Sequence, residues 1–350
     1  MNYIGSKFSL LPFIEKVFCR IQDGKEKVVC DLFAGTAAVG RFFKRKGLRV
    51  IANDLQYYAY VLNKAYLELN QPPPFKNLEK QYAKVLMGYR NPAVDSVQAI
   101  LSFINQIAPQ RGFITENYAP CGNRFYYTQD NAERADAIRQ TLERWRKEKI
   151  INEREYFYLL CSLLEAIDQV ANTASVYGAY LKKFKASARK PLKLKPLELT
   201  NGVRGCKAYN QDANQLIKQI TCDVLYLDPP YNHRQYGANY HVLETIAAYD
   251  APQLRGVTGM RDYPRSRYCK PLEALEAMRE LITAAQTKHI LVSYNDEGIM
   301  SLEDIRELLS LRGEPQTFSQ KYNRFKADNG RQYKRGETVE YLHYVRVVKS

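Results

Sequence analysis

The stretch Asp228–Tyr231, Asp-Pro-Pro-Tyr, combines a carboxylate, two prolines and an aromatic ring directly after the apolar run 224–227. Two prolines remove two backbone donors and fix φ, so the segment is rigid and its carbonyl oxygens stay available as acceptors. The Asp228 carboxylate and the Pro229 carbonyl could accept both hydrogens of an exocyclic amine on a flat base, and Tyr231 could stack on that base. Such hydrogen bonds favour a pyramidal nitrogen whose lone pair points outward. In isolation, however, these four residues are more often a plain Pro-Pro turn.

A second candidate site follows Asp31, which ends a short strand predicted over 28–30. The small-residue turn 33–36 comes next, and a helix is predicted from about Ala37 to Lys46. In open α/β sheets, ligands lie at the carboxyl ends of strands, where small residues let backbone amides approach closely. Asp54 lies 19 residues beyond Gly35, at the end of the next predicted strand, where an acid can take both hydroxyls of a ribose. A tight turn beside a solvated acid is an equally plain interpretation of this pair.

Strands and helices that alternate at both ends of the chain must position these residues. A helix is predicted over 57–69 and ends at the proline triplet 72–74. Strands are predicted again after residue 200, at 224–227, 290–293 and 339–348. The sequence therefore predicts an α/β protein with one doubly wound sheet. Because a strand-turn-helix unit of the nucleotide-binding type precedes Asp228–Tyr231 in the chain, a functional role for these four residues is favoured over a plain turn.

The middle of the chain has a different texture, helix plus loop. Asp130 with Glu133 three residues on resembles a capping box that would start a helix. Apolar residues then recur at spacings of three and four on one predicted helix face, and a second predicted helix shows the same pattern. These two faces comprise Ala135, Ile138, Leu142 and Trp145, and then Tyr156, Leu160, Leu163, Ile167 and Val170.

Taken in order, five stretches resemble the Dam-like class (class alpha) of adenine-specific DNA methyltransferases, in the branch found in restriction-modification systems. The stretches are Asn2–Lys7, DLFAGT at Asp31–Thr36, Asn53-Asp54, Asp212 in YNQDANQL, and Asp228–Tyr231. This resemblance implies the Rossmann-like fold of S-adenosylmethionine-dependent methyltransferases. It also implies a discontinuous catalytic domain, residues 1–70 and 200–350, interrupted by a mostly helical target-recognition insertion, residues 71–199, that binds DNA.

The resemblance further implies which residues act. The methyl donor, S-adenosyl-L-methionine, would be bound with Asp54 on its ribose and Asp212 at its adenine, and the full set of cofactor-binding residues is Tyr3, Lys7, Asp31, Phe33, Gly35, Thr36, Asp54, Asp212 and Asp228. The target adenine, flipped out of double-stranded DNA, would be held by the catalytic residues Asp228, Pro229, Pro230 and Tyr231. One departure is Ala37, which stands where the family's FxGxG pattern has its second glycine, so the turn must accept a Cβ there.

The charge of the chain favours nucleic acid as its partner. There are 52 Lys and Arg residues against 37 Asp and Glu, a net charge of +15. Such a chain attracts polyanions. The best candidates for DNA contact are Arg234, just after the Asp-Pro-Pro-Tyr stretch, and a run of cations without acidic residues, of which we single out Lys182, Lys183, Lys185, Arg189 and Lys190. A solvated flexible run, which continues to Lys195, is the alternative interpretation.

Composition also excludes several classes. No apolar run approaches the roughly 18 residues needed to span a bilayer. The seven cysteines are scattered without a CxxC pair, and the four histidines lack metal-ligand spacing, so we expect reduced thiols and no metal site. We expect a cytoplasmic prokaryotic or phage enzyme, monomeric on DNA, with a cognate restriction endonuclease as a further partner. Two alternatives are adenine-N6 methylation of RNA, against which the large insertion argues, and a DNA-binding module with an inert methylase fold, against which the intact motifs argue.

Overall fold

The computed structural model describes residues 5–90, 95–323 and 337–348. Contacts divide the chain into two compact units that alternate along the sequence. The sheet unit comprises residues 5–63, 202–237 and 264–350, and the helical unit comprises residues 1–4, 64–201 and 238–263. Two helices, α3 (Tyr57–Glu68) and α11 (Tyr236–Asn239), run across a division between the units.

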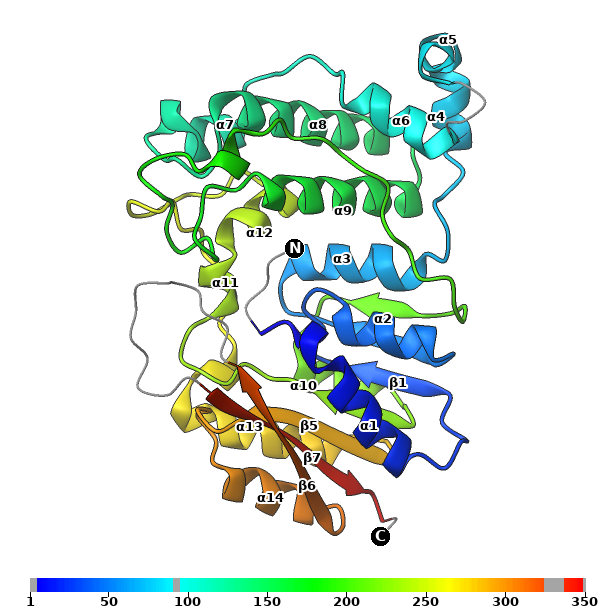
Figure 1. The fold of residues 1–350 in the computed structure, drawn as a ribbon, viewed down its shortest axis with the longest axis vertical. Coiled ribbons are helices and arrows are strands. Elements are labelled where there is room, and N and C mark those ends of the chain that lie inside the picture. Colours follow the sequence, from blue (N-terminus) through cyan, green and yellow to red (C-terminus); the bar gives the residue numbers. More distant parts are fainter. Residues whose placement is uncertain (1–4, 91–94, 324–336, 349–350) are drawn as a thin grey trace. The chain divides into compact units, whose positions relative to one another are not determined.

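One mixed sheet organises the sheet unit (Figure 1), with the strand order β3-β2-β1-β4-β5-β7-β6. The strands from β3 to β5 are parallel, and β7 pairs antiparallel with both β5 and β6. All residues of β4 and β5 are buried, as expected for central strands covered on both faces. The strands are β1 (Val28–Asp31), β2 (Arg49–Asn53), β3 (Lys207–Tyr209), β4 (Val224–Leu227), β5 (His289–Asn295), β6 (Pro315–Asn323) and β7 (Glu337–Arg346).

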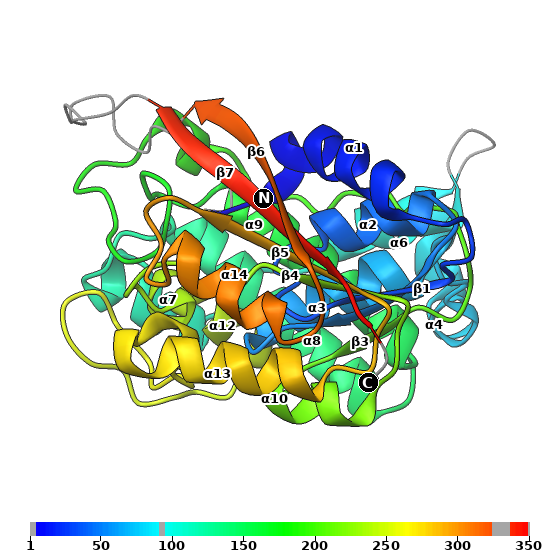
Figure 2. The same cartoon turned by 90° about the horizontal axis from the view of Figure 1, so that it is seen from below.

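Helices cover both faces of this sheet (Figure 2). On one face, α13 and α14 bury apolar side chains against β4 and β5 in a single core cluster, which includes Leu225, Ile290 and Val292. On the opposite face lie α1 and α2, which pack Phe18 against Phe43. The predicted doubly wound α/β fold is confirmed. The helices wholly within this unit are η1 (Lys7–Leu10), α1 (Leu11–Ile21), α2 (Ala38–Arg45), α10 (Ala213–Leu216), η5 (Ile217–Gln219), η6 (Arg267–Cys269), α13 (Pro271–Ala284) and α14 (Leu302–Ser310).

The helical unit is built on α8 and α9, whose predicted apolar faces are buried. The capping-box prediction at Asp130 is wrong, because the cap of α8 lies two residues earlier, at Thr128, whose side chain accepts from the Asn131 N–H. A complete capping box instead starts α9, at Asn152 and Glu155. The helices are α4 (Lys76–Gln81), α5 (Ala83–Leu86), η2 (Met87–Tyr89), α6 (Ser96–Ile104), α7 (Phe113–Tyr118), η3 (Pro120–Gly122), α8 (Gln129–Lys147), α9 (Glu153–Gln169), η4 (Ala186–Arg189) and α12 (His241–Ala248).

Residues 238–263 pack with the helical unit, whereas the sequence division assigned them to the catalytic domain. The fully buried Arg139 of α8 holds this segment, because its guanidinium donates to the carbonyl oxygens of Ile246, at 2.9 Å, and Ala247, at 3.3 Å. The buried hydroxyl of Tyr118 adds a hydrogen bond to Thr245, at 3.1 Å. These contacts join residues more than 100 positions apart, so no local sequence pattern announces them.

Candidate functional site

The carboxyl ends of β1, β2 and β4 bring the predicted acidic residues to one edge of the sheet. Asp31 is the last residue of β1 and pairs in register with Ala52 and Tyr226. Asp54 and Asp228 follow the last residues of β2 and β4, so all three carboxylates lie at the edge where open α/β sheets bind ligands. Burial raises the pKa of Asp31 well above its usual range, and the nearby charges of Asp228 and Asp54 raise it further.

The turn after β1 is held in a fixed shape by side chains of the next strand and helix. Gly35 has φ 48°, and its N–H donates to Asp54 Oδ2 at 2.8 Å, while its carbonyl accepts from the Asn63 side chain at 3.0 Å. Ala37 caps α2 in the left-handed conformation, with φ 64° and ψ 16°, and its side chain is fully buried. The turn thus has the backbone shape that favours glycine, yet it accommodates the Cβ of Ala37.

Asp54 braces this turn as well as facing the edge of the sheet. One carboxylate oxygen accepts from Gly35, as above, and the other accepts from the Gln56 N–H at 2.9 Å. The backbone carbonyl of Asp54 in turn accepts from the Asn210 side chain at 2.8 Å. The carboxylate is therefore oriented by its own loop, a bracing role that the spacing of Gly35 and Asp54 did not predict.

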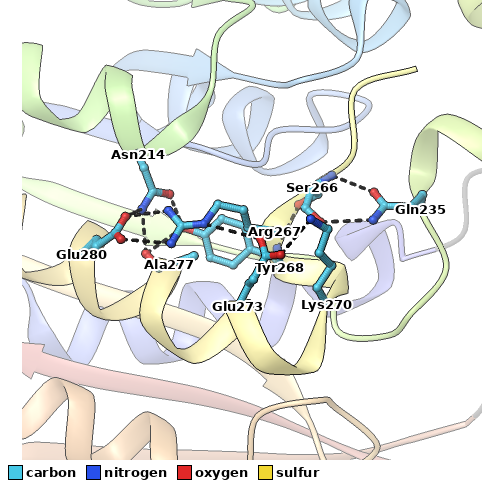
Figure 3. Close-up of polar contacts among 9 residues, drawn as sticks. All are labelled: Asn214, Gln235, Ser266, Arg267, Tyr268, Lys270, Glu273, Ala277 and Glu280. Atoms are coloured by element: carbon cyan, nitrogen blue, oxygen red, sulfur yellow. Dashed lines mark hydrogen bonds and ion pairs between the residues drawn. The ribbon is translucent and has the colours of Figure 1, made fainter. Parts of the chain in front are cut away.

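Asp212 is exposed, and its side chain caps α10. One carboxylate oxygen accepts from the N–H groups of Asn214, at 2.9 Å, and Gln215, at 3.1 Å. Asn214 in turn accepts the buried hydroxyl of Tyr268 at 2.7 Å, and the ring of Tyr268 meets Phe33 edge-on with centroids 4.9 Å apart. Figure 3 shows Asn214 between Tyr268 and Glu280. The predicted residues Phe33 and Asp212 are thus tied together through two side chains that the sequence did not single out.

The side chain of Lys7 lies among carboxylates. Its ammonium is 3.1 Å from Asp228 Oδ1 and 3.6 Å from Glu340 Oε2, and all three side chains are largely buried, with exposed fractions of 6, 17 and 11%. Although burial alone would lower the pKa of Lys7, the charges of Asp228 and Glu340 raise it above its ordinary value. Burial, the largest effect, raises the pKa of Asp228 to about 6. The negative charge of Glu340 also raises this pKa, whereas the positive charge of Lys7 lowers it.

Glu340 was missed by the sequence analysis. It lies near the start of β7, opposite Asn295 at the carboxyl end of β5, and antiparallel pairing therefore brings it to the same edge as Asp228. Alternation along β7 places Glu340 on the same strand face as Leu342 and Tyr344, which are both buried. A carboxylate on a buried strand face calls for a partner, which Lys7 provides.

The Asp-Pro-Pro-Tyr segment and the loop after it are fixed by hydrogen bonds. The Tyr231 carbonyl accepts from the Ile299 N–H at 2.9 Å, and burial raises the pKa of the Tyr231 hydroxyl. Farther on, the Gln235 side chain donates to the Ser266 carbonyl at 3.1 Å and accepts from the Ser266 N–H at 2.8 Å (Figure 3). Arg234, just before this contact, is exposed.

The predicted DNA-contact run lies in the helical unit and divides into two kinds of residue. Lys182, Lys183, Arg189 and Lys190 are exposed. Lys185 is partly buried instead, and its ammonium donates to the Thr173 carbonyl at 2.7 Å. Four of the five cations are thus presented to solvent, while the fifth is held by its own unit.

An extended segment, residues 190–197, continues this run and is fixed to the helices. The Asn131 side chain donates to the carbonyls of Ala188 and Lys190 and accepts from the Leu192 N–H, and the Asn105 side chain makes the same kind of pair with both backbone groups of Leu194. Leu192 and Leu194 are buried, whereas the alternate residues Lys193 and Lys195 are exposed. The Leu-Lys alternation could have predicted this pattern.

Three remaining predictions concern Tyr3, a metal site and a membrane-spanning segment. Tyr3, a predicted cofactor residue, lies outside the described residues. Within the described ranges, no three histidine, cysteine, aspartate or glutamate side chains gather to hold a metal ion. None of the helices in those ranges has the length and apolar character needed to cross a bilayer.

Comparison with known proteins assigns the family. The chain is 42% identical over 349 residues to the Type II methyltransferase M.NlaIII of Neisseria lactamica, covering 98% of each protein. It is 40% identical over 353 residues to the Type II methyltransferase M.FokI of Planomicrobium okeanokoites, covering 99% of this chain but 52% of that relative, and 35% identical to M.CviAII of Paramecium bursaria Chlorella virus 1, over 93% of each. The family model of the D12 class N6 adenine-specific DNA methyltransferases matches residues 3–308. The chain belongs to this family and is a site-specific DNA adenine methyltransferase of the restriction-modification type.

Proposed function

We propose that the methyl donor is S-adenosyl-L-methionine, bound at the carboxyl ends of β1, β2, β3 and β4. The observation that carries the proposal is the meeting of Asp31, Asp54 and Asp228 at one edge of the parallel strands. Among the described residues, Asp31 Oδ1 is a buried carboxylate oxygen without a hydrogen-bond partner, so a donor group on a ligand would satisfy it. The carboxylates of Asp228 and Glu340 share the single ammonium of Lys7, and the excess negative charge also fits a cationic ligand such as a sulfonium.

The residues that would hold the donor keep the roles that the family resemblance implies. Phe33, Gly35 and Thr36 surround the methionine part with Asp31 at its base, Asp54 takes the ribose hydroxyls, and Asp212 meets the adenine; Tyr3 and Lys7 complete the set. When bound, S-adenosylmethionine supplies a methyl group that is already activated for transfer. The protein's own work is therefore alignment of the acceptor and exclusion of water.

The target adenine is proposed to lie against Asp228–Tyr231. The Asp228 carboxylate and the Pro229 carbonyl accept the two hydrogens of N6, which favours an outward lone pair, Pro230 keeps the segment rigid, and Tyr231 stacks on the ring. We also assign to Asp228 the acceptance of the proton that N6 must release, because a pKa of about 6 leaves its carboxylate ionised at neutral pH. An adenine stacked in duplex DNA cannot reach this segment, so we infer that the base is flipped out.

The helical unit is proposed to read DNA. Exposed cations on it and on the sheet unit are available to phosphates, namely Lys182, Lys183, Arg189, Lys190 and Arg234, and the structure supports adding Lys193 and Lys195. Lys185, which the sequence grouped with them, has a structural contact that competes with such a role. A cognate restriction endonuclease, action as a monomer and location in the cytoplasm remain part of this proposal.

Transfer of a labelled methyl group from S-adenosylmethionine tests these assignments. We expect label in duplex DNA carrying the recognition site, and sequencing of methylated adenines in a host that expresses the chain should reveal one short sequence. Ribosomal RNA serves as the alternative acceptor, and label found only there would contradict the DNA assignment. Calorimetric titration with S-adenosylhomocysteine tests the donor site without any turnover, and the absence of binding would overturn the proposed cofactor.

A further inference from the structure

The charges of Lys7, Asp228 and Glu340, which meet at the carboxyl end of β4, do not sum to zero. The Lys7 ammonium is shared between Asp228, at 3.1 Å, and Glu340, at 3.6 Å, so two carboxylates face one cation. These groups come from η1, the segment after β4, and β7, which meet only in the folded chain. The other titratable groups that the structure couples electrostatically to this cluster are Asp31, Tyr226, Tyr231 and Glu297. None of them adds a second cation.

Among the residues that the structure describes, Lys7 is the partner of the Glu340 carboxylate. Its side chain is 11% exposed, and among the described residues Oε2 accepts no hydrogen bond, its only ion pair being the one with Lys7. A buried carboxylate is unfavourable unless it is paired. A lone structural ion pair would need only one carboxylate, so the second one changes how strongly Lys7 can neutralise Asp228.

We propose that Glu340 is a positioning residue for methyl transfer, which acts by sharing the Lys7 ammonium with Asp228. This proposal rests on the proposed role of Asp228 at the target amine. If Lys7 paired with Asp228 alone, the ammonium would compete with the N6 hydrogens for the same carboxylate oxygens. With Glu340 present, the cation is divided, and Asp228 keeps acceptor capacity and basicity for the amine. The cluster also keeps a surplus negative charge where the acceptor nitrogen becomes positive.

The test is Glu340→Gln, which keeps the size of the side chain and removes its charge. We expect kcat to fall about tenfold at pH 8, which corresponds to a decrease of roughly one unit in the pKa of Asp228. KM for DNA should stay nearly unchanged. The acid limb of the rate profile should move to lower pH, because the pKa of Asp228 loses the contribution of Glu340. Glu340→Asp should restore part of the rate. Glu303→Gln, which removes an exposed carboxylate of the same unit, is the matched control and should change neither quantity.

A readout without turnover separates the outcomes. Carbon-13 NMR titration of the aspartate carboxyl groups in the protein alone, with Asp228→Asn for assignment, should show a lower pKa for Asp228 in Glu340→Gln. An unchanged Asp228 titration, or a lower kcat without a shifted acid limb, would overturn the inference and leave Glu340 a structural residue. If instead the unsubstituted protein transferred no methyl group to DNA, the proposed function itself would fail.

Discussion

Asp228 shows how environment, rather than residue type, suits a carboxylate to its proposed task. Burial raises its pKa and Lys7 opposes this, so the group is ionised at neutral pH yet basic enough to accept a proton. The sequence predicted Asp228 and Lys7 because both lie in motifs. It missed Glu340, since strand pairing and not spacing brings residue 340 to residue 7.

Replacement of Asp228 tests its role at the amine most directly. Asp228→Ala should abolish methyl transfer, because the principal acceptor for the N6 hydrogens is lost, while binding of the methyl donor stays measurable by calorimetry. Asp228→Asn, of the same size, should also be nearly inactive. Full activity in either variant would refute the assignment.

The pH profile of kcat/KM, which reports ionisations in the free enzyme, should report the ionisation of Asp228. Its raised pKa, about 6, means that the carboxylate form predominates above pH 6 and is lost below it. The rate should therefore be half-maximal near pH 6 and fall about tenfold for each further unit of acid. Values of kcat/KM between pH 5 and 8 measure this, and a profile that stays flat down to pH 5 would exclude Asp228 as the group that must be ionised.

At the scale of elements, local patterns predicted the central strands and the two longest helices but not what fixes them. Short apolar runs that end at a polar residue predicted β1, β4 and β5. The strand β3, Lys-Ala-Tyr, has no such run, and hydrogen-bonded pairing with β2 defines it. Likewise, Asn105 and Asn131 are ordinary helix residues in the sequence, yet they hold the extended segment 190–197 to the helical unit.

Loss of the Asn131 side chain should destabilise the protein. Asn131→Ala removes three hydrogen bonds and leaves the buried Leu192 N–H without its acceptor, so we expect a loss of about 2–4 kcal/mol in the free energy of unfolding. Urea denaturation measures it. The neighbouring exposed residue supplies a control, Asp130→Asn, which should change stability by less than about 0.5 kcal/mol.

The salt dependence of DNA binding should identify which lysines meet phosphates. The double variant Lys193→Gln and Lys195→Gln should bind DNA more weakly. The magnitude of the negative slope of log K against log salt should decrease by about 1.8, which is two phosphate contacts at roughly 0.9 each. Loss of Lys182 and Lys183 should act similarly, whereas Lys185→Gln should alter the slope little. The double variant Lys16→Gln and Lys25→Gln removes the same charge elsewhere; an equal slope change there would show that only net charge matters.

At the scale of the molecule, both units contain buried histidines whose pKa is lowered by burial, His343 in the sheet unit and His241 in the helical unit. Apart from Tyr3, the residues proposed for the donor and amine sites belong to the sheet unit. The helical unit contains His241, whose imidazole donates from Nε2 to the Tyr177 carbonyl at 2.9 Å. Burial lowers the pKa of His241 to about 4, so the ring is neutral in the folded protein.

This histidine predicts a loss of stability in mild acid. The unfolded chain binds a proton at His241 near pH 6.5, while the folded protein does so only near pH 4, so stability falls as the pH drops between these values, by at most about 1.4 kcal/mol per unit. Asp228, with its raised pKa, acts in the opposite direction over pH 6 to 4. Urea denaturation of His241→Gln should therefore show a flatter dependence on pH than the parent, and an identical slope in both would contradict the prediction.

The helical unit, which we propose reads DNA, is interleaved with the sheet unit along the chain, and this limits how it could be exchanged between relatives. In a chimera that takes only residues 64–201 from this chain and the rest from a relative, Arg139 would face the relative's carbonyl groups. Its own partners, the carbonyls of Ile246 and Ala247, would not be transferred. A chimera that moves residues 238–263 together with that cassette should fold, whereas one that moves the cassette alone should be insoluble. Recombination that exchanges both helical segments between relatives and leaves residues 202–237 in place would thus need four crossovers, two on each side of the Asp-Pro-Pro-Tyr stretch.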